Sequence, residues 1–157
     1  MQAKLLALTV LQPFATGIVQ WGKPVENRSW LPGARLPVGS WLAIHAGAKD
    51  YPDADDIRFR NWIGSLCNDH NQRFATGYLT KLPHSAIVGV ARVAGFSDSS
   101  AKISCWSAIG QEQWRFDQHM PFVEPVPCKG MQGLWEVKGD VLAKVREQWD
   151  PSKVRTY

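Results

Sequence analysis

The chain of 157 residues has few cysteines and no long hydrophobic run. Its three cysteines, Cys67, Cys105 and Cys128, are an odd number at wide spacings, with no Cys-x-x-Cys and no Cys/His pairs at zinc spacing. This pattern predicts neither a disulfide framework nor a metal site. No segment approaches the roughly 18 apolar residues of a membrane span, and the N-terminus lacks the apolar core of a signal peptide. We therefore expect a soluble, cytoplasmic protein that has no membrane partner.

Nucleotide-cofactor motifs and charge of one sign are also scarce. There is no Gly-x-Gly-x-x-Gly, and Gly22-Lys23 lacks the upstream glycine and the following Ser or Thr of a Walker motif. We therefore expect no cofactor. The net charge of +4 is consistent with an anionic partner without requiring one. With 45% hydrophobic residues and no internal repeat, residues 1–157 are expected to form a single domain.

Hydrophobic periodicity indicates mixed strands and short helices, which is the α+β class. Leu6, Leu8 and Val10 alternate as in a strand, and Pro13 suits the first turn of a helix that ends near Gly22. The remaining expected elements are strands over 39–48, 85–96 and within 124–138, and helices over 50–67 and 140–149. Residues 97–120 have weak helical periodicity and few strand formers, and we interpret them as an insertion.

Three charged residues, Lys23, Glu26 and Arg28, lie within six positions of an otherwise apolar region. If this segment is extended, Glu26 and Arg28 point to one face, where opposite charges pair and still leave donors free. The alternative is an ordinary surface cluster that contributes little energy.

Tryptophan is abundant, with eight in the chain. Aromatic rings beside cations suit single-stranded nucleic acid, because the ring stacks on a base while the cation meets a phosphate. Trp41 and Trp135 lie in apolar strands and are expected in the core. Trp30 follows Arg28 closely and fits either role.

Three segments together resemble one family, the ASCH domain (activating signal cointegrator homology) of the PUA-like superfamily. The segments are LQPFATGIVQWGKPVENRSW, GSWLAIHAGAK and VPCKGMQGLWEV. The matching features are Gln12-Pro13, the Lys-x-x-Glu-x-Arg core, Ser29-Trp30, His45 and Lys129-Gly130. The resemblance spans residues 5 to 138 and implies a PUA-like mixed-strand pseudo-barrel, with a few short helices around a central cleft. Residues 139–157 would then form a C-terminal helix and tail.

The resemblance implies binding of RNA, single-stranded nucleic acid or a nucleoside with a modified base. Lys23, Arg28 and Lys129 can neutralise phosphates, whereas Gln12 and Glu26 can read hydrogen-bonding groups on a base. The expected ligand-binding residues are Gln12, Lys23, Glu26, Arg28, Trp30, His45 and Lys129.

Two alternatives remain open from the sequence. Some relatives in the family are hydrolases, either nucleoside amidohydrolases that act on acetylcytidine or ribonucleases. In a hydrolase, Lys23 and Glu26 would be catalytic, but Glu26 stands where the amidohydrolases have a threonine. The third hypothesis is a protein-interaction module of the coactivator type, whose footprint would be an exposed aromatic patch.

Overall fold

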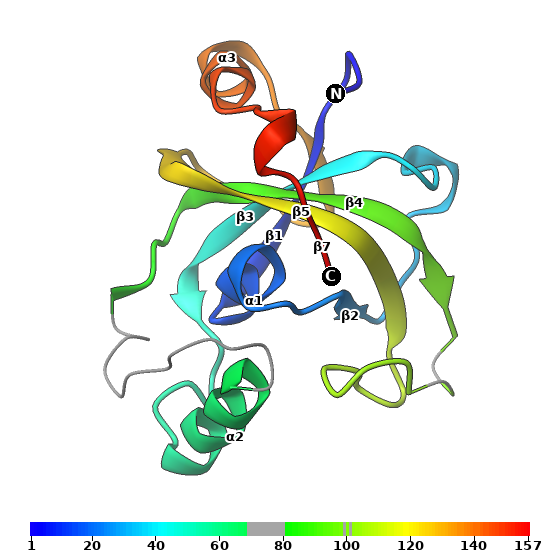
Figure 1. Ribbon diagram of the computed structural model, residues 1–157, viewed down its shortest axis with the longest axis vertical. Helices are drawn as coiled ribbons and strands as arrows, with labels where there is room; N and C mark the ends of the chain where they lie inside the picture. Colours follow the sequence, from blue (N-terminus) through cyan, green and yellow to red (C-terminus); the bar gives the residue numbers. More distant parts are fainter. Residues whose placement is uncertain (69–80, 99, 101) are drawn as a thin grey trace.

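The computed structural model describes residues 1–68, 81–98, 100 and 102–157 (Figure 1). Its helices are α1 (Phe14–Gln20), α2 (Ile57–Asn68) and α3 (Gly139–Glu147), with short 3-10 turns at Gly33–Arg35 and Pro151–Lys153. Its strands are β1 (Leu6–Gln12), β2 (Val25–Arg28), β3 (Trp41–Asp50), β4 (Ala86–Ser97), β5 (Glu112–Pro127), β6 (Leu134–Glu136) and β7 (Arg155–Thr156). No helix in this described part of the chain is long and apolar enough to cross a membrane.

The strands form one curved sheet in the order β2-β5-β4-β3-β1-β6, with β7 paired to β5. β1 and β3 are parallel, whereas the other pairs are antiparallel. Figure 1 shows α1 in the hollow of this sheet, and α3 above it. The mixed sheet with short helices confirms the predicted α+β class.

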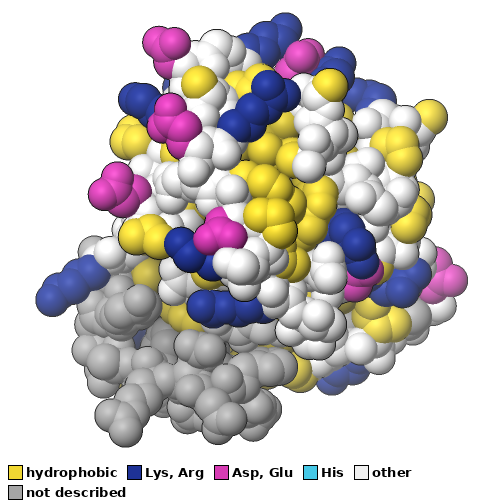
Figure 2. All heavy atoms as spheres, turned by 45° about the horizontal axis from the view of Figure 1, so that its top comes forward, with side chains coloured by type: hydrophobic (Ala, Val, Ile, Leu, Met, Phe, Trp, Pro, Cys, Tyr) yellow, Lys and Arg dark blue, Asp and Glu magenta, His cyan; other side chains and the backbone are white. Residues whose placement is uncertain are grey.

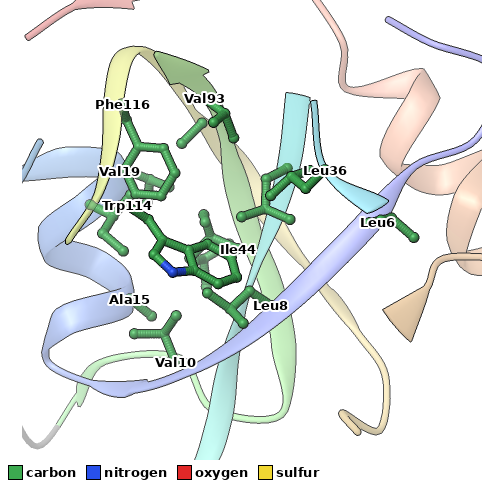
Figure 3. Packing of buried hydrophobic residues seen from close by; sticks show 14 of the residues in the cluster. Leu6, Leu8, Val10, Ala15, Val19, Leu36, Ile44, Val93, Trp114 and Phe116 are labelled. Atoms are coloured by element: carbon green, nitrogen blue, oxygen red, sulfur yellow. The ribbon is translucent and has the colours of Figure 1, made fainter. Parts of the chain in front are cut away.

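The two faces of β1 contribute to two different hydrophobic clusters, as its alternation predicts. Leu6, Leu8 and Val10 point to the inner face and pack with α1, whereas Leu5 and Ala7 point to the outer face. The inner cluster centres on the fully buried Trp114, whose ring lies among side chains from α1, β1 and β3 (Figure 3). This inner cluster fixes α1 against the sheet.

The outer face of the sheet is covered by α3 and the tryptophans predicted for the core. Trp135 is 8% exposed, and Trp41 is partly buried against Trp149, with ring centroids 4.9 Å apart. After α3 the chain returns to the sheet as β7. The hydroxyl of Tyr157 donates to the carbonyl of Ile18 in α1 at 2.6 Å, so this end of the chain packs onto the fold.

The segment 97–120 differs from the insertion that we expected. Residues 112–120 form the first half of β5, which lies inside the sheet between β2 and β4. Trp114 and Phe116 point inward at the two-residue period of a strand, and this burial outweighs the weak helical periodicity. Helix α2 also differs in part from the helix expected over 50–67, because it begins only at Ile57.

Candidate functional site

A sharp turn between α1 and β2 places Lys23 inside the protein. Gly22 has φ +72°, a left-handed conformation that glycine adopts without strain, and the backbone N–H of Lys23 then donates to the carbonyl of Gly17 at 3.0 Å. The carbonyl of Pro24 accepts a hydrogen bond from the N–H of Phe116 in β5 at 2.8 Å. The lysine is therefore directed inward by the backbone on both sides.

The Lys23 side chain is 2% exposed, and its ammonium group is enclosed by three partners. Nζ donates to the carbonyl of Val25 at 2.6 Å and to Oε2 of Glu26 at 2.8 Å, and it lies 5.2 Å from the centroid of the Phe14 ring. Burial lowers the pKa of Lys23, whereas Glu26 acts in the opposite direction. The lysine is held by the protein and is closed to solvent.

Glu26 connects this lysine to Arg28. Its second oxygen, Oε1, lies 3.1 Å from Nε of Arg28, although the N–H there is not aligned for a hydrogen bond. Nη2 of Arg28 donates to the carbonyl of Thr9 in β1 at 2.7 Å. The Glu26 carboxylate therefore forms ion pairs with both Lys23 and Arg28. The Arg28 side chain, at 24% exposure, is the member of this cluster that reaches solvent.

The contact between Arg28 and Thr9 closes the curved sheet where its two ends approach each other. In the described part of the chain, β6 pairs with β1 as far as Leu8, and this ladder does not continue to Thr9. Arg28 bridges from β2 to this edge, and Nη2 of Arg35 donates to the carbonyl of Leu134 in β6 at 2.9 Å. We call the place where Arg28 meets Thr9 the seam.

Thr9 is a site residue that the sequence analysis missed. Its Oγ1 lies 3.2 Å from Nδ1 of His45, 3.1 Å from the carbonyl of Met131 and 3.2 Å from Nε1 of Trp135. The indole N–H donates to this oxygen, and the single hydroxyl proton can go to His45 or to Met131 but not to both. Its pairing opposite His45 across the parallel β1–β3 ladder is the signal that could have found it.

His45 is buried beside the Lys129-Gly130 segment. Nε2 must donate to the carbonyl of Cys128 at 2.9 Å, because a carbonyl only accepts, and burial lowers the pKa of His45. A Cβ on Gly130 would lie 2.5 Å from Cε1 of His45 and 2.6 Å from Oγ1 of Thr9. The glycine is thus needed for close packing, while the neighbouring Lys129 is exposed on the same segment.

Two other residues expected at the site have their groups engaged within the fold. Gln12 is fully buried, where Nε2 donates to the carbonyl of Pro83 at 2.8 Å and Oε1 accepts from the N–H of Thr16 at 3.0 Å. Trp30 packs edge-on against Trp114, with ring centroids 4.9 Å apart. In this structure Gln12 positions the start of α1, and Trp30 extends the core.

The structure therefore connects four of the seven expected residues, Lys23, Glu26, Arg28 and His45, and places Lys129 on an adjoining segment. Lys23, Glu26 and Arg28 form a chain of contacts, and Thr9 connects Arg28 to His45 and to the segment that carries Lys129. Two surface cavities of about 710 and 620 Å³ lie between β5 and the α3–β7 region, and neither is lined by any of the seven. Within the Lys23–Glu26–Arg28 cluster, the residue that reaches the surface is Arg28, at the seam.

An aromatic cluster at α2 lies behind the lysine and was also missed. The Phe14 ring contacts those of Tyr51, Phe59 and Trp62 at centroid distances of 5.2, 5.9 and 6.5 Å. Tyr51 is 37% exposed, so this cluster extends from the buried Lys23 to the surface. It joins residues from three separate segments, which periodicity within one segment does not reveal.

Comparisons with known proteins identify the fold. No protein-family model matches the sequence, and no curated protein is similar to it. The crystal structure of the ASCH protein from Zymomonas mobilis matches with a TM-score of 0.56 and 14% identity, covering 92% of this chain and 94% of that chain.

Two mutants of the Zymomonas mobilis protein, one with tyrosine changed to phenylalanine and one with serine changed to alanine, also match. Their TM-scores are 0.54 and 0.51, their identities 14% and 16%, and the coverage is 92% of this chain and 97% and 95% of theirs. At such low identity the likeness shows the fold alone, an α+β fold with one mixed sheet that this chain shares with that ASCH protein.

Proposed function

We propose that this chain is an ASCH-family protein that binds RNA, or a nucleoside derived from RNA, at the seam. The supporting observation is the carboxylate that two cations share. With Lys23 charged, the cluster of Lys23, Glu26 and Arg28 has a net charge of +1, and Arg28 is its exposed end. An anionic or electron-rich ligand at the seam would balance this charge at its exposed end.

Arg28 is suited to this role by its chemistry and by how it is held. Its guanidinium is planar and always charged, and it presents several donors in a fixed fork that matches a phosphate or a base edge. Contacts with Glu26 and Thr9 fix its orientation before any ligand arrives. A pre-oriented side chain loses less conformational entropy on binding.

The modest net charge favours a local site over a broad electrostatic one. Figure 2 shows one face of the molecule, where acidic and basic side chains are interspersed around a hydrophobic patch. The net charge of only +4 agrees with this distribution. Binding should therefore depend on a few contacts at the seam, with Lys129 as the second cation, and only modestly on salt.

A hydrolase is the second candidate, and one observation favours it. Burial lowers the pKa of Lys23, as a lysine that acts as a base or nucleophile requires. Nζ, however, is bound to Val25 and Glu26 and is closed to solvent, so a substrate would have to displace those contacts. Binding without catalysis is therefore the function that we favour.

The test of binding is a titration of labelled single-stranded RNA by fluorescence anisotropy at two salt concentrations. We expect Arg28→Ala to weaken binding about tenfold or more, which corresponds to roughly 1.4 kcal/mol. Lys129→Ala should reduce the salt dependence by about 0.7 in log–log slope. Arg58→Ala is the matched control, because this exposed arginine pairs with Asp56, away from the seam. Equal affinity of wild type and Arg28→Ala would contradict the proposal.

The hydrolase is tested separately by release of acetate from acetylcytidine, followed by mass spectrometry. Wild type and Lys23→Met are compared at equal concentration. Turnover that disappears in Lys23→Met would replace the binding proposal with a lysine-dependent hydrolase. Absence of turnover in both proteins, together with RNA binding, would support the binding function.

A further inference from the structure

The connection between β5 and β6 carries Lys129 and is fixed to the sheet on both sides of this lysine. The connection forms no strand or helix of its own. Nε2 of His45 donates to the carbonyl of Cys128 at 2.9 Å, and Oγ1 of Thr9 lies 3.1 Å from the carbonyl of Met131. Lys129 is exposed between these two carbonyls. Its position therefore depends on His45 and Thr9, which we together call the clamp.

Thr9 also holds the other cation of the proposed site. Its main-chain carbonyl accepts from Nη2 of Arg28 at 2.7 Å, while its side-chain oxygen contacts the Met131 carbonyl. A Cβ on Gly130 would come within 2.6 Å of the same oxygen, so the segment lies directly on Thr9. The main chain and the side chain of one residue thus set the positions of Arg28 and of the segment that carries Lys129.

The hydrogen bonds at the Thr9 hydroxyl are incomplete while His45 is neutral. A hydroxyl has one proton to donate and can accept two hydrogen bonds. This one accepts from the indole N–H of Trp135 at 3.2 Å. The single ring proton of neutral His45 is on Nε2, bonded to Cys128, so Nδ1 and the Met131 carbonyl both need the hydroxyl proton. Whichever of the two acceptors receives it, the other does not.

Protonation of His45 removes this competition. In the imidazolium both ring nitrogens donate, Nε2 to the carbonyl of Cys128 and Nδ1 to Oγ1 of Thr9. The hydroxyl then accepts from two donors, and its own proton goes to the Met131 carbonyl. Both carbonyls that flank Lys129 are then bonded at the same time.

His45 itself is the group beside Lys129 that titrates near neutral pH. Its ladder partners in β1 and β4, Thr9 and Ile87, carry no charge, and β6 contributes an indole ring. The segment contributes the exposed Lys129 and the thiol of Cys128, whose pKa is raised by burial. Burial lowers the pKa of His45, and its bond to the Cys128 carbonyl raises it. His45 therefore gains its second proton below about pH 6.5, where the thiol stays neutral.

Resting on the proposed function, we infer that Thr9 and His45 position Lys129 for a phosphate of the RNA, and that protonation of His45 completes this clamp. RNA binding at the seam therefore becomes tighter as the pH falls. A segment that is ordered beforehand loses less conformational entropy when its lysine binds a phosphate. By linkage, bound RNA in turn raises the pKa of His45.

The first test needs no RNA and follows the clamp by NMR in ¹⁵N-labelled full-length protein. The amide of Gln132 comes directly after the Met131 carbonyl, so its signal reports the hydrogen bond that this carbonyl accepts. We expect this signal to titrate together with the ring nitrogens of His45 in wild type and in Thr9→Ser. In Thr9→Val, which lacks the hydroxyl, it should no longer follow His45. A Gln132 signal that does not follow His45 in wild type would overturn the inference, whether or not Thr9→Val folds.

The second test measures the affinity for labelled single-stranded RNA by fluorescence anisotropy at about pH 7.5 and about pH 5.5, at constant salt. We expect the affinity of wild type to rise about threefold more than that of Thr9→Val or Lys129→Ala. The other histidines gain protons equally in all of these proteins, so the difference reports the clamp. Thr9→Ser should keep the pH dependence of wild type, because it keeps the hydroxyl.

The outcomes separate this inference from the proposed function. RNA binding with the same pH dependence in wild type, Thr9→Val and Lys129→Ala would overturn the positioning role and leave the proposed function in place. RNA binding that also raises the pKa of His45 would support the positioning role. If no RNA binds to any of these proteins at either pH, the proposed function fails, and the positioning of Lys129 for a phosphate fails with it.

Discussion

Replacing Glu26 by glutamine would leave the ammonium of Lys23 buried without its counter-ion. Removing one member of a buried ion pair destabilises a protein by about 3–5 kcal/mol, because the remaining charge is no longer compensated. Lys23 is 2% exposed and Nζ lies 2.8 Å from the carboxylate. We therefore expect Glu26→Gln to lower the free energy of unfolding at pH 7 by an amount in this range. That is a large part of the 5–15 kcal/mol typical of a domain.

The pH dependence identifies Lys23 as the cause. Its folded-state pKa is lowered, and Glu26 is the neighbour that raises it, so Glu26→Gln should lower that pKa further. A lysine whose folded pKa lies below its unfolded value binds fewer protons when folded, so stability rises with pH between the two values. From pH 7 to 9 the stability of Glu26→Gln should therefore rise more steeply than that of wild type, at up to about 1.4 kcal/mol per pH unit.

Urea denaturation followed by tryptophan fluorescence measures both effects. The control is Glu26→Gln combined with Lys23→Met, which removes both charges and should recover most of the lost stability at pH 7. The reasoning is refuted if Glu26→Gln loses less than about 1 kcal/mol, or if the double variant is no more stable than Glu26→Gln alone.

Two further predictions concern the packing around His45. Gly130→Ala should lower the free energy of unfolding, measured by urea denaturation, by about 1–3 kcal/mol, because the added Cβ would overlap His45 and Thr9. The control is Gly47→Ala, which should be affected less because its Cβ would meet its neighbours at 3.4 Å. The pKa of His45 is lowered, so stability should fall as pH drops below about 6.5, where the unfolded histidine binds a proton and the folded one does not. The pKa of His119 is lowered too, so His45→Asn should only partly reduce the fall in stability at low pH. If stability changes with pH as steeply in His45→Asn as in wild type, His45 is not buried in its neutral form.

Local patterns were sufficient to predict the elements whose own residues alternate between the two faces of the sheet. β1 and β4 were expected from alternating or continuous apolar residues, and α1 from Pro13 and the glycine that follows the helix. Residues 124–127 of β5 lie in an expected strand region, but the rest of β5 was missed because its second half contains three prolines and its first half mixes Trp114 and Phe116 with polar residues. Its place between β2 and β4 is set by distant partners, which a local pattern does not contain.

The candidate site was predictable to a similar degree. The spacing of Lys23, Glu26 and Arg28 indicated an interacting cluster, and the structure joins the three side chains through one carboxylate. Thr9 was missed because its contacts depend on how β6 and the segment before it lie along β1, and those residues are more than 120 positions away. Burial of Lys23 likewise depends on Phe14 and the turn that follows α1.

The pairing of β2 with β5 has a consequence for the order in which this chain can fold. The charged cluster lies within the first 30 residues, but among the described residues the strand that pairs with β2 is Glu112–Arg115 of β5, where Trp114 lies opposite Glu26. The chain loses conformational entropy in closing this long loop before the contacts between β2 and β5 can stabilise it, and this slows folding. During synthesis on a ribosome, Lys23 and Glu26 therefore emerge long before β5, the strand that buries them. Both side chains stay charged and hydrated until about three-quarters of the chain has been made.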